Sequence, residues 1–306
     1  AFFYGGMVRA KGVLNMLMMS ISAMGVVTVL WVLYGYSLAF GNDVANLFGD
    51  PTQYFGLKGL IGGTYLQATA DAPAVSIPLA GTIPQTVFVA FQLMFAIITV
   101  ALISGAVADR LKFGGWLVFA GLWATFVYFP VAHWVFAFNG VTAEHGGWIA
   151  TKLLAIDFAG GTAVHINSGT AGLVLALILG KRAGWPHTPM RPHNLPFVML
   201  GAGLLWFGWY GFNAGSAVGS NGIAGATFIT TTIATGAAML GWLLTERIRD
   251  GHATTLGAAS GIVAGLVAIT PSCSSVNVVG ALAIGVGAGI FCALAVGLKF
   301  KFGFDD

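Results

Sequence analysis

Long stretches without a charged residue constrain the fold of this chain more than any other feature. They cover residues 12–42, 72–108, 113–143, 158–180, 192–245 and 251–298. A helix of about 20 apolar residues crosses a bilayer, so the last two runs, with 54 and 48 residues, have room for two spans each. Only 8% of the 306 residues are charged, against about 25% in soluble domains. The sequence therefore predicts an integral membrane protein.

The uncharged runs predict an all-α, polytopic helical bundle, because they lack strict alternation and are too long for membrane strands. A chain with 45 glycines also has the small residues that let membrane helices pack closely. Residues 1–6 resemble the end of a helix, a stub, whose beginning is missing. Eight full helices are expected after it, at about 14–40, 84–107, 114–138, 159–180, 195–216, 222–245, 255–270 and 277–299.

Lysine and arginine are distributed unevenly between the loops. Only Lys58 and Lys152 fall on one side of the expected bundle, and the other 11 of the 13 basic residues fall on the opposite side. Basic residues mark the cytoplasmic loops of membrane proteins. We therefore expect the stub to exit into the cytoplasm and the loops 42–83 and 139–157 to lie outside.

His165 lies well inside the uncharged run 158–180 and has small helical neighbours at Gly161, Ser168 and Gly172. Small residues allow another backbone to approach, so this face is expected to point at protein. An ionisable side chain within a span is a functional candidate. The alternative is a histidine that only hydrogen-bonds a neighbouring helix, and both readings are open from this stretch alone.

Aromatic and hydroxyl side chains mark two further helices. Phe88, Phe91 and Phe95 share one helical face, which is either core or the wall of a narrow apolar path. Residues 206–216 combine aromatic rings with glycines and end at Ser216. Aromatic residues near a membrane end are usually interfacial anchors. A hydroxyl beside aromatic faces also suits a cation.

Two polar residues near the outer ends of spans have ordinary structural explanations. Asp157 is placed to cap the helix that follows it, and capping is weighed equally with a direct role. His133 is explained by a polar contact at the outer end of its helix. The net charge of +3 is small and does not suggest a nucleic-acid partner.

Several motifs, in order along the whole chain, resemble the ammonium transporters (Amt/Mep/Rh). They lie at residues 3–9, 30–41, 181–182, 192–196 and 208–216, together with DFAGGTAVHIN at 157–167. The resemblance implies eleven spans in two inverted five-helix repeats, about 1–180 and 195–306 here. It also implies a homotrimer in the cell's inner or plasma membrane that takes up ammonium nitrogen, with no enzymatic activity, cofactor or metal.

The resemblance also implies a substrate path. Phe91, Phe95 and Ser216 match an outer ammonium site, while Phe95 and Phe212 match a stacked phenylalanine gate. His165 matches the first of two pore histidines, and Asp157 matches an acidic residue near the outer site. Phe136 stands where the family usually has a tryptophan, and its weaker cation–π attraction bears on affinity.

The resemblance further implies that the chain is a fragment. It would lack most of the first helix and the last two helices, including the second pore histidine. Such a fragment is expected neither to form a stable trimer nor to transport. A PII-type regulator at the cytoplasmic face is implied for bacterial relatives.

The expected function is transport of ammonium or ammonia, with methylammonium as an analogue. An apolar pore penalises any bare ion, whereas a neutral imidazole at His165 can accept a hydrogen bond or pass a proton. A sensor of the same fold is an alternative. A haem protein with His133 and His165 as axial ligands is a further alternative, against which the outer position of His133 argues.

Overall fold

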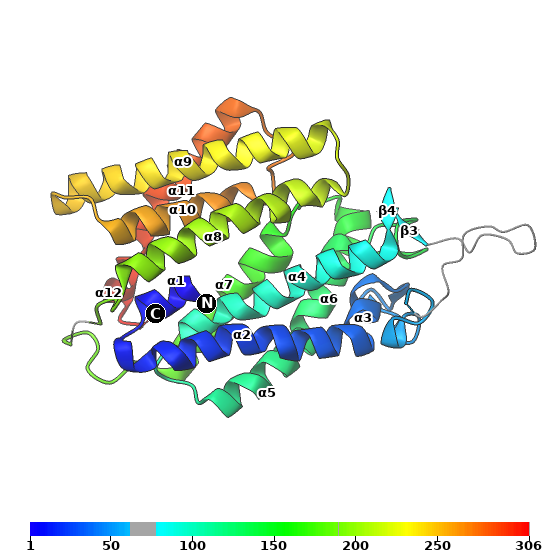
Figure 1. Cartoon of the computed structure of the whole chain (residues 1–306), viewed down its shortest axis with the longest axis horizontal. Helices are drawn as coiled ribbons and strands as arrows, with labels where there is room; N and C mark the ends of the chain where they lie inside the picture. Colours follow the sequence, from blue (N-terminus) through cyan, green and yellow to red (C-terminus); the bar gives the residue numbers. More distant parts are fainter. Residues whose placement is uncertain (62–77, 189, 306) are drawn as a thin grey trace, which may run out of the picture. The chain divides into compact units, whose positions relative to one another are not determined.

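The computed structural model describes residues 1–61, 78–188 and 190–305 of the chain. The described part is mostly helical, as Figure 1 shows. Residues 62–77 of the expected outer loop 42–83 lie outside the described residues, as do Pro189 and Asp306.

The eight helices expected from the sequence are all present among the described residues. The stub is α1 (Phe2–Met7), and the first full helix consists of η1 (Ala10–Gly12), α2 (Val13–Leu30), η2 (Trp31–Gly35) and α3 (Tyr36–Phe40). The second consists of α4 (Gln85–Ile103) and η4 (Ser104–Val107), and the third of α5 (Phe113–Trp123), η5 (Ala124–Tyr128) and α6 (Phe129–Phe136). The fourth consists of η7 (Gly161–Ile166) and α7 (Asn167–Leu179). The last four are α8 (Leu195–Asn213) with η8 (Ala214–Ala217); α9 (Gly222–Asp250); α10 (Thr255–Ile269); and α11 (Val278–Ala295), which leads into α12 (Leu298–Phe302).

Length and composition allow seven of these helices in the described chain to cross a membrane. The remaining one, α10, is apolar but has only 15 residues. Large apolar side chains on the spans are exposed, among them Phe207 at 76% and Ile178 at 74%. Such side chains are at home against lipid, since a bilayer presents no water to them. The chain is a multi-pass helical membrane protein.

Short irregular elements join the helices. β1 (Asp43–Val44) pairs antiparallel with β2 (Phe48–Gly49), and β3 (Leu79–Ala80) pairs antiparallel with β4 (Ile83–Pro84). The other elements are η3 (Phe55–Leu57) and η6 (Ile149–Leu153). These segments lie between helices α3 and α4 and between α6 and η7, in the loops expected outside.

The described chain divides into two compact units. The first comprises residues 1–22, 101–117 and 157–306, and the second comprises residues 23–100 and 118–156. The boundary expected between the two repeats, near residues 180–195, does not coincide with the division into these units. The inverted repeat stays a prediction.

Small residues form the helix contacts of the first unit. A Cβ added to Gly285 of α11 would lie 2.3 Å from the carbonyl oxygen of Ala234 in α9. One added to Gly289 would lie 2.2 Å from the carbonyl oxygen of Ala238. The two backbones therefore touch, which explains why α9 and α11 run alongside each other in Figure 1.

Aromatic rings form the core of the second unit. The ring of Trp31 lies 5.6 Å from Tyr36, 6.2 Å from Phe40 and 5.7 Å from Phe129, centroid to centroid. All four side chains are fully buried, and Trp31 Nε1 donates to the carbonyl oxygen of Val89 at 3.2 Å. This indole donor is therefore satisfied in an otherwise apolar core.

Candidate functional site

Asp157 holds the start of the helix that carries His165. Its Oδ1 accepts from the backbone N–H groups of Gly160 and Gly161 at 2.8 and 2.6 Å. Its Oδ2 accepts from those of Thr162 and Ala163 at 2.7 and 3.2 Å. A carboxylate at this end also complements the positive end of the helix dipole. The capping role expected from the sequence is therefore confirmed, and it occupies both oxygens.

Close backbone packing fixes the first turn of η7. A Cβ on Gly161 would lie 2.5 Å from a ring carbon of Pro271, and the Phe158 N–H donates to the Pro271 carbonyl at 3.0 Å. Two turns after His165, Gly172 lies where an added Cβ would contact the side chain of Ala106 at 3.3 Å. The expectation that this small-residue face points at protein is confirmed. Gly161 and Gly172 each have a packing partner within the first unit.

The His165 ring lies among aromatic rings of α8. Its centroid is 5.3 Å from that of Trp209, with planes 23° apart, and 5.8 Å from that of Phe212. Both ring nitrogens are buried, and neither has a hydrogen-bond partner within the described part of the chain. Buried polar atoms are nearly always paired, so two unpaired ones on a single ring call for a functional explanation.

A buried hydrogen-bond chain holds Trp209 in place. Trp209 Nε1 donates to Thr270 Oγ1 at 2.9 Å, and Thr270 Oγ1 lies 3.3 Å from Asn213 Oδ1. Asn213 Nδ2 in turn donates to Thr231 Oγ1 at 3.1 Å. Trp209 is 5% exposed, so it is a buried ring, whereas aromatic residues near a membrane end are usually interfacial anchors. The three-residue spacing between Trp209 and Phe212, which puts both rings on one helical face, was the sequence feature that could have indicated this position.

Ser216 lies in η8, one turn after Phe212. Its hydroxyl donates to the carbonyl oxygen of Phe212 at 2.7 Å. With its hydrogen used, the oxygen has lone pairs left to accept a hydrogen bond. This geometry suits the acceptor role expected from the sequence. Asp157, His165, Phe212 and Ser216 all belong to the first unit.

Phe91, Phe95 and Phe136 form a cluster in the second unit. The Phe95 centroid lies 4.9 Å from Phe91 and 6.0 Å from Phe136, both in edge-on arrangements. Phe95 is 1% and Phe136 6% exposed. The resemblance placed these three rings at one outer site; the structure shows that they lie together, and the site stays a prediction. The expected stacking of Phe95 on Phe212 joins residues of two units and stays a prediction.

Trp134 has a different environment from its near neighbour Phe136. Trp134 Nε1 donates to the carbonyl oxygen of Leu47 at 2.7 Å, and its ring lies 5.9 Å from that of Trp148. Trp134 therefore belongs to the contacts of the loop segments, whereas Phe136 belongs to the phenylalanine cluster.

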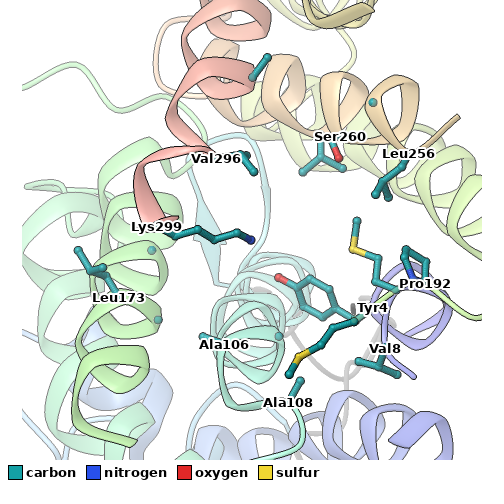
Figure 2. Close-up of a pocket in the computed structure, with 18 of the residues that line it drawn as sticks. Tyr4, Val8, Ala106, Ala108, Leu173, Pro192, Leu256, Ser260, Val296 and Lys299 are labelled. Carbon is teal, nitrogen blue, oxygen red and sulfur yellow. The ribbon is translucent and has the colours of Figure 1, made fainter. Parts of the chain in front are cut away.

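A cavity of about 840 Å³ lies within the first unit and reaches His165. Around it, Figure 2 shows Tyr4 from α1, Leu173 from α7, Ser260 from α10 and Lys299 from α12. Its walls also include Ser168, beside His165, and residues of the loop after α7. The face of η7 and α7 that carries His165 and Ser168 can therefore be reached through this cavity from the side of that loop.

The described residues contain no group of three or more His, Cys, Asp or Glu side chains that could hold a metal ion. Both nitrogens of His133 are engaged, Nδ1 with the Ala39 carbonyl and Nε2 with Asp43. A haem iron would have to displace one of these bonds. The polar contact expected for His133 is present at this end of α6, whereas its position on the outer side stays a prediction.

Comparison with known proteins gives a consistent result. The model of the Ammonium Transporter Family matches residues 1–306. An ammonium transporter of Mycobacterium tuberculosis (strain H37Rv) is 81% identical over 308 residues, and one of Bacillus subtilis (strain 168) is 46% identical over 312 residues. Both alignments cover 100% of this chain, but only 65% and 70% of the respective relative.

Solved structures agree in fold. Saccharomyces cerevisiae Mep2 is 38% identical with a TM-score of 0.84, over 97% of this chain and 64% of that one. A protein described as a sensor Amt protein is 26% identical with a TM-score of 0.85, over 100% and 72%. The chain thus spans about 65% of the length of the first relatives. The family match extends over the whole chain and gives no support to the expected truncation.

Proposed function

Because the chain belongs to the ammonium transporter family, we propose that the protein carries ammonium or ammonia across a membrane through an apolar pore in each subunit. The observation that carries this proposal is the His165 ring, with two buried, unpaired nitrogens beside Trp209 and Phe212. A neutral imidazole can accept a hydrogen bond from ammonium or take up its proton. Potassium has the same charge but offers neither.

Recruitment of ammonium belongs to the phenylalanine cluster and Ser216. The faces of Phe91, Phe95 and Phe136 attract a cation, and the Ser216 oxygen accepts one of its hydrogens. Asp157 contributes by fixing the helix start, because all of its observed hydrogen bonds go to backbone N–H groups. We assign it no direct contact with substrate.

Ammonium loses its proton before it reaches His165, and ammonia passes the imidazole. An unaccompanied ion in apolar surroundings loses its hydration without compensation, which costs several kcal/mol or more. Ammonia avoids this cost because it is neutral. The stacked Trp209 ring keeps the imidazole edge free, so that its nitrogens are available to the passing molecule.

The assembly follows the family. We propose a homotrimer in the inner or plasma membrane, with the stub reaching the cytoplasm and the loops 42–83 and 139–157 outside. The two repeats are about 1–180 and 195–306. A PII-type regulator docks on the cytoplasmic face. The eleven basic residues on that side support the orientation.

A sensor is the second candidate function. The structural likeness to a sensor Amt protein, with a TM-score of 0.85 at 26% identity, favours keeping it. A sensor binds ammonium at the outer site but conducts little or none. Binding and flux together therefore separate the two functions.

Uptake of labelled methylammonium into vesicles containing the purified protein is the direct test. We expect saturable uptake that ammonium inhibits and potassium does not. Binding of ammonium without uptake would support the sensor and refute transport. Uptake that potassium inhibits equally would refute the assigned path past His165.

A further inference from the structure

Two hydrogen-bond acceptors face the ring of His133, which is fully buried in α6. Nδ1 lies 3.2 Å from the carbonyl oxygen of Ala39, and Nε2 lies 3.0 Å from Oδ1 of Asp43. A carbonyl oxygen and an ionised carboxylate can only accept. A neutral imidazole has a single N–H and can satisfy one of them. Both contacts are hydrogen bonds only when the ring carries two protons.

The Ala39 carbonyl depends on His133 for its donor. It lies in the last turn of α3, where later backbone N–H groups would normally approach. The N–H of Asn42 instead donates to Gln53 Oε1 at 2.7 Å, and that of Asp43 donates to the carbonyl oxygen of His145 at 2.9 Å. A cationic side chain at the end of a helix also complements the helix dipole. The local structure thus favours a protonated ring.

Asp43 is held in position for this contact. Its second oxygen, Oδ2, accepts from the Asn46 N–H at 3.0 Å, and its backbone pairs with Gly49 across β1 and β2. Its side chain is only 16% exposed. Oδ1 is therefore kept against Nε2 by the loop itself and not by the histidine alone.

The end of α6 is enclosed around His133. The Ala137 N–H donates to the His133 carbonyl, and a Cβ on Gly147 would lie 1.9 Å from that same oxygen. Phe136 lies in this last turn, with its ring 6.0 Å from that of Phe95. His133 and Phe136 therefore share the last turn of α6, one turn apart.

The segments packed around this ring contribute few other charged or titratable groups. In the described part of the chain these are Tyr128 on η5, Tyr36 on α3, Asp50 after β2, Tyr54 and Lys58 beside η3, Glu144 and His145 before η6, and Lys152 on η6. Asp50 accepts from Thr52, and Lys152 donates to Asn46 Oδ1. Glu144 and His145 are exposed. Asp43 is the carboxylate at hydrogen-bonding distance from the ring.

We propose that His133 is an imidazolium in the folded protein, and that its bonds to Ala39 and Asp43 make it a positioning residue. It fixes the end of α6 so that Phe136 faces Phe95 at the ammonium-recruiting cluster. The positioning role rests on the proposed function, whereas the charge state of the ring does not. Replacing Asp43 by Asn tests the charge of the His133 ring separately from the position of the ring. The Asn amide can donate to a bare Nε2, which keeps the hydrogen bond with a neutral ring.

Nitrogen NMR of the protein labelled at histidine reads the charge directly. At neutral pH, His133 should show two similar ring-nitrogen shifts, as an imidazolium does. In Asp43→Asn the shifts should separate as in a neutral ring protonated at Nδ1. The signal is assigned by its loss in His133→Gln, with His145→Gln as the matched control from the same loop region. A neutral His133 in the unaltered protein would overturn the proposal.

Methylammonium uptake reads the positioning role. Asp43→Ala should raise the half-saturation concentration by about threefold or more, with the maximal rate within about twofold. Asp43→Asn should stay close to the unaltered protein. If Asp43→Ala left the half-saturation concentration unchanged, or if Asp43→Asn matched Asp43→Ala, positioning through this bond would be wrong.

A fluorinated phenylalanine at position 136 gives a readout that does not need transport. The unaltered protein and Asp43→Asn should each show one sharp fluorine signal, and Asp43→Ala a broadened or split one. A sharp, unshifted signal in Asp43→Ala would refute the positioning role, whatever the flux. Absence of flux in the unaltered protein, with these spectra as expected, would instead refute the proposed function.

Discussion

His133 and His165 are histidines of helical spans with buried ring nitrogens, but these nitrogens have opposite surroundings. Both nitrogens of His133 are hydrogen-bonded, to Ala39 and Asp43. Both nitrogens of His165 are unpaired in the described chain, and its faces meet aromatic rings. A fully bonded ring holds structure together, whereas an unbonded one is available to a passing molecule. We therefore expect His133 to hold the structure together and His165 to serve conduction.

Replacing His165 by Ala should have the largest effect. Loss of one hydrogen bond worth ~1.4 kcal/mol slows a step about tenfold, so selective methylammonium uptake should fall at least that far. Folding should change little, because the ring makes no hydrogen bond that is lost. His187→Ala, in the exposed loop after α7, is the matched control. Unchanged uptake and selectivity in His165→Ala would break the comparison.

Replacing Asp157 by Ala tests whether the helix start is structural. Four backbone N–H groups lose their acceptor, and loss of a helix cap costs about 1–2 kcal/mol. Thermal unfolding of the purified protein should shift downward by a corresponding amount. If the unfolding temperature were unchanged while uptake disappeared, Asp157 would have a role in conduction, as proposed for His165, and not a structural role like that of His133.

Replacing Trp209 by Phe tests whether the position of the ring stacked on His165 affects uptake. The bond to Thr270 Oγ1 is lost, while an aromatic face against the imidazole is kept. We expect uptake to fall about threefold, less than for His165→Ala, since a neutral hydrogen bond contributes ~1 kcal/mol. Thr270→Val removes the same partner and should give a similar loss. A full loss in Trp209→Phe alone would show that the indole itself contacts substrate.

Replacing Ser216 by Ala should change affinity more than rate. One hydrogen bond contributes about 0.5–1.5 kcal/mol, so the half-saturation concentration should rise by about two- to tenfold. The concentration dependence of uptake measures this. If the maximal rate changed while the half-saturation concentration stayed constant, Ser216 would act in conduction, as proposed for His165, and not in recruitment.

Replacing Phe136 by Trp should have the smallest effect. An indole attracts a cation more strongly than a phenyl ring, and a whole cation–π interaction contributes only ~0.5–1 kcal/mol at exposed sites. We expect a tighter half-saturation concentration and the same maximal rate. Because Phe136 is one turn from His133, an unchanged affinity would also remove the reason for His133 to position it.

Local patterns in the sequence predicted much of this structure. Uncharged runs located all eight helices, and the small residues at Gly161 and Gly172 correctly indicated a protein-facing side. The Asp157 cap was also predictable, since its partners follow within six residues. Phe91, Phe95 and Phe136 were grouped only through the family resemblance.

Contacts between distant residues could not be read from the sequence. Asp43 lies 90 residues before His133, and no periodicity connects them. The hydrogen bond that holds Trp209 joins it to Thr270, which lies 61 residues later in the chain. The π-helical turns at η2, η5 and η7 depend on packing and leave the apolar pattern nearly unchanged.

The π-helical turn of η7 makes the length of this segment matter as much as its composition. The His165 N–H bonds to the Gly160 carbonyl, five residues back, at 3.1 Å. Each residue of an α-helix turns the chain by about 100°, so inserting or deleting one residue between Gly161 and His165 would swing the imidazole off the face of Trp209. Natural variants of this protein should therefore exchange residues within this segment while keeping its length constant.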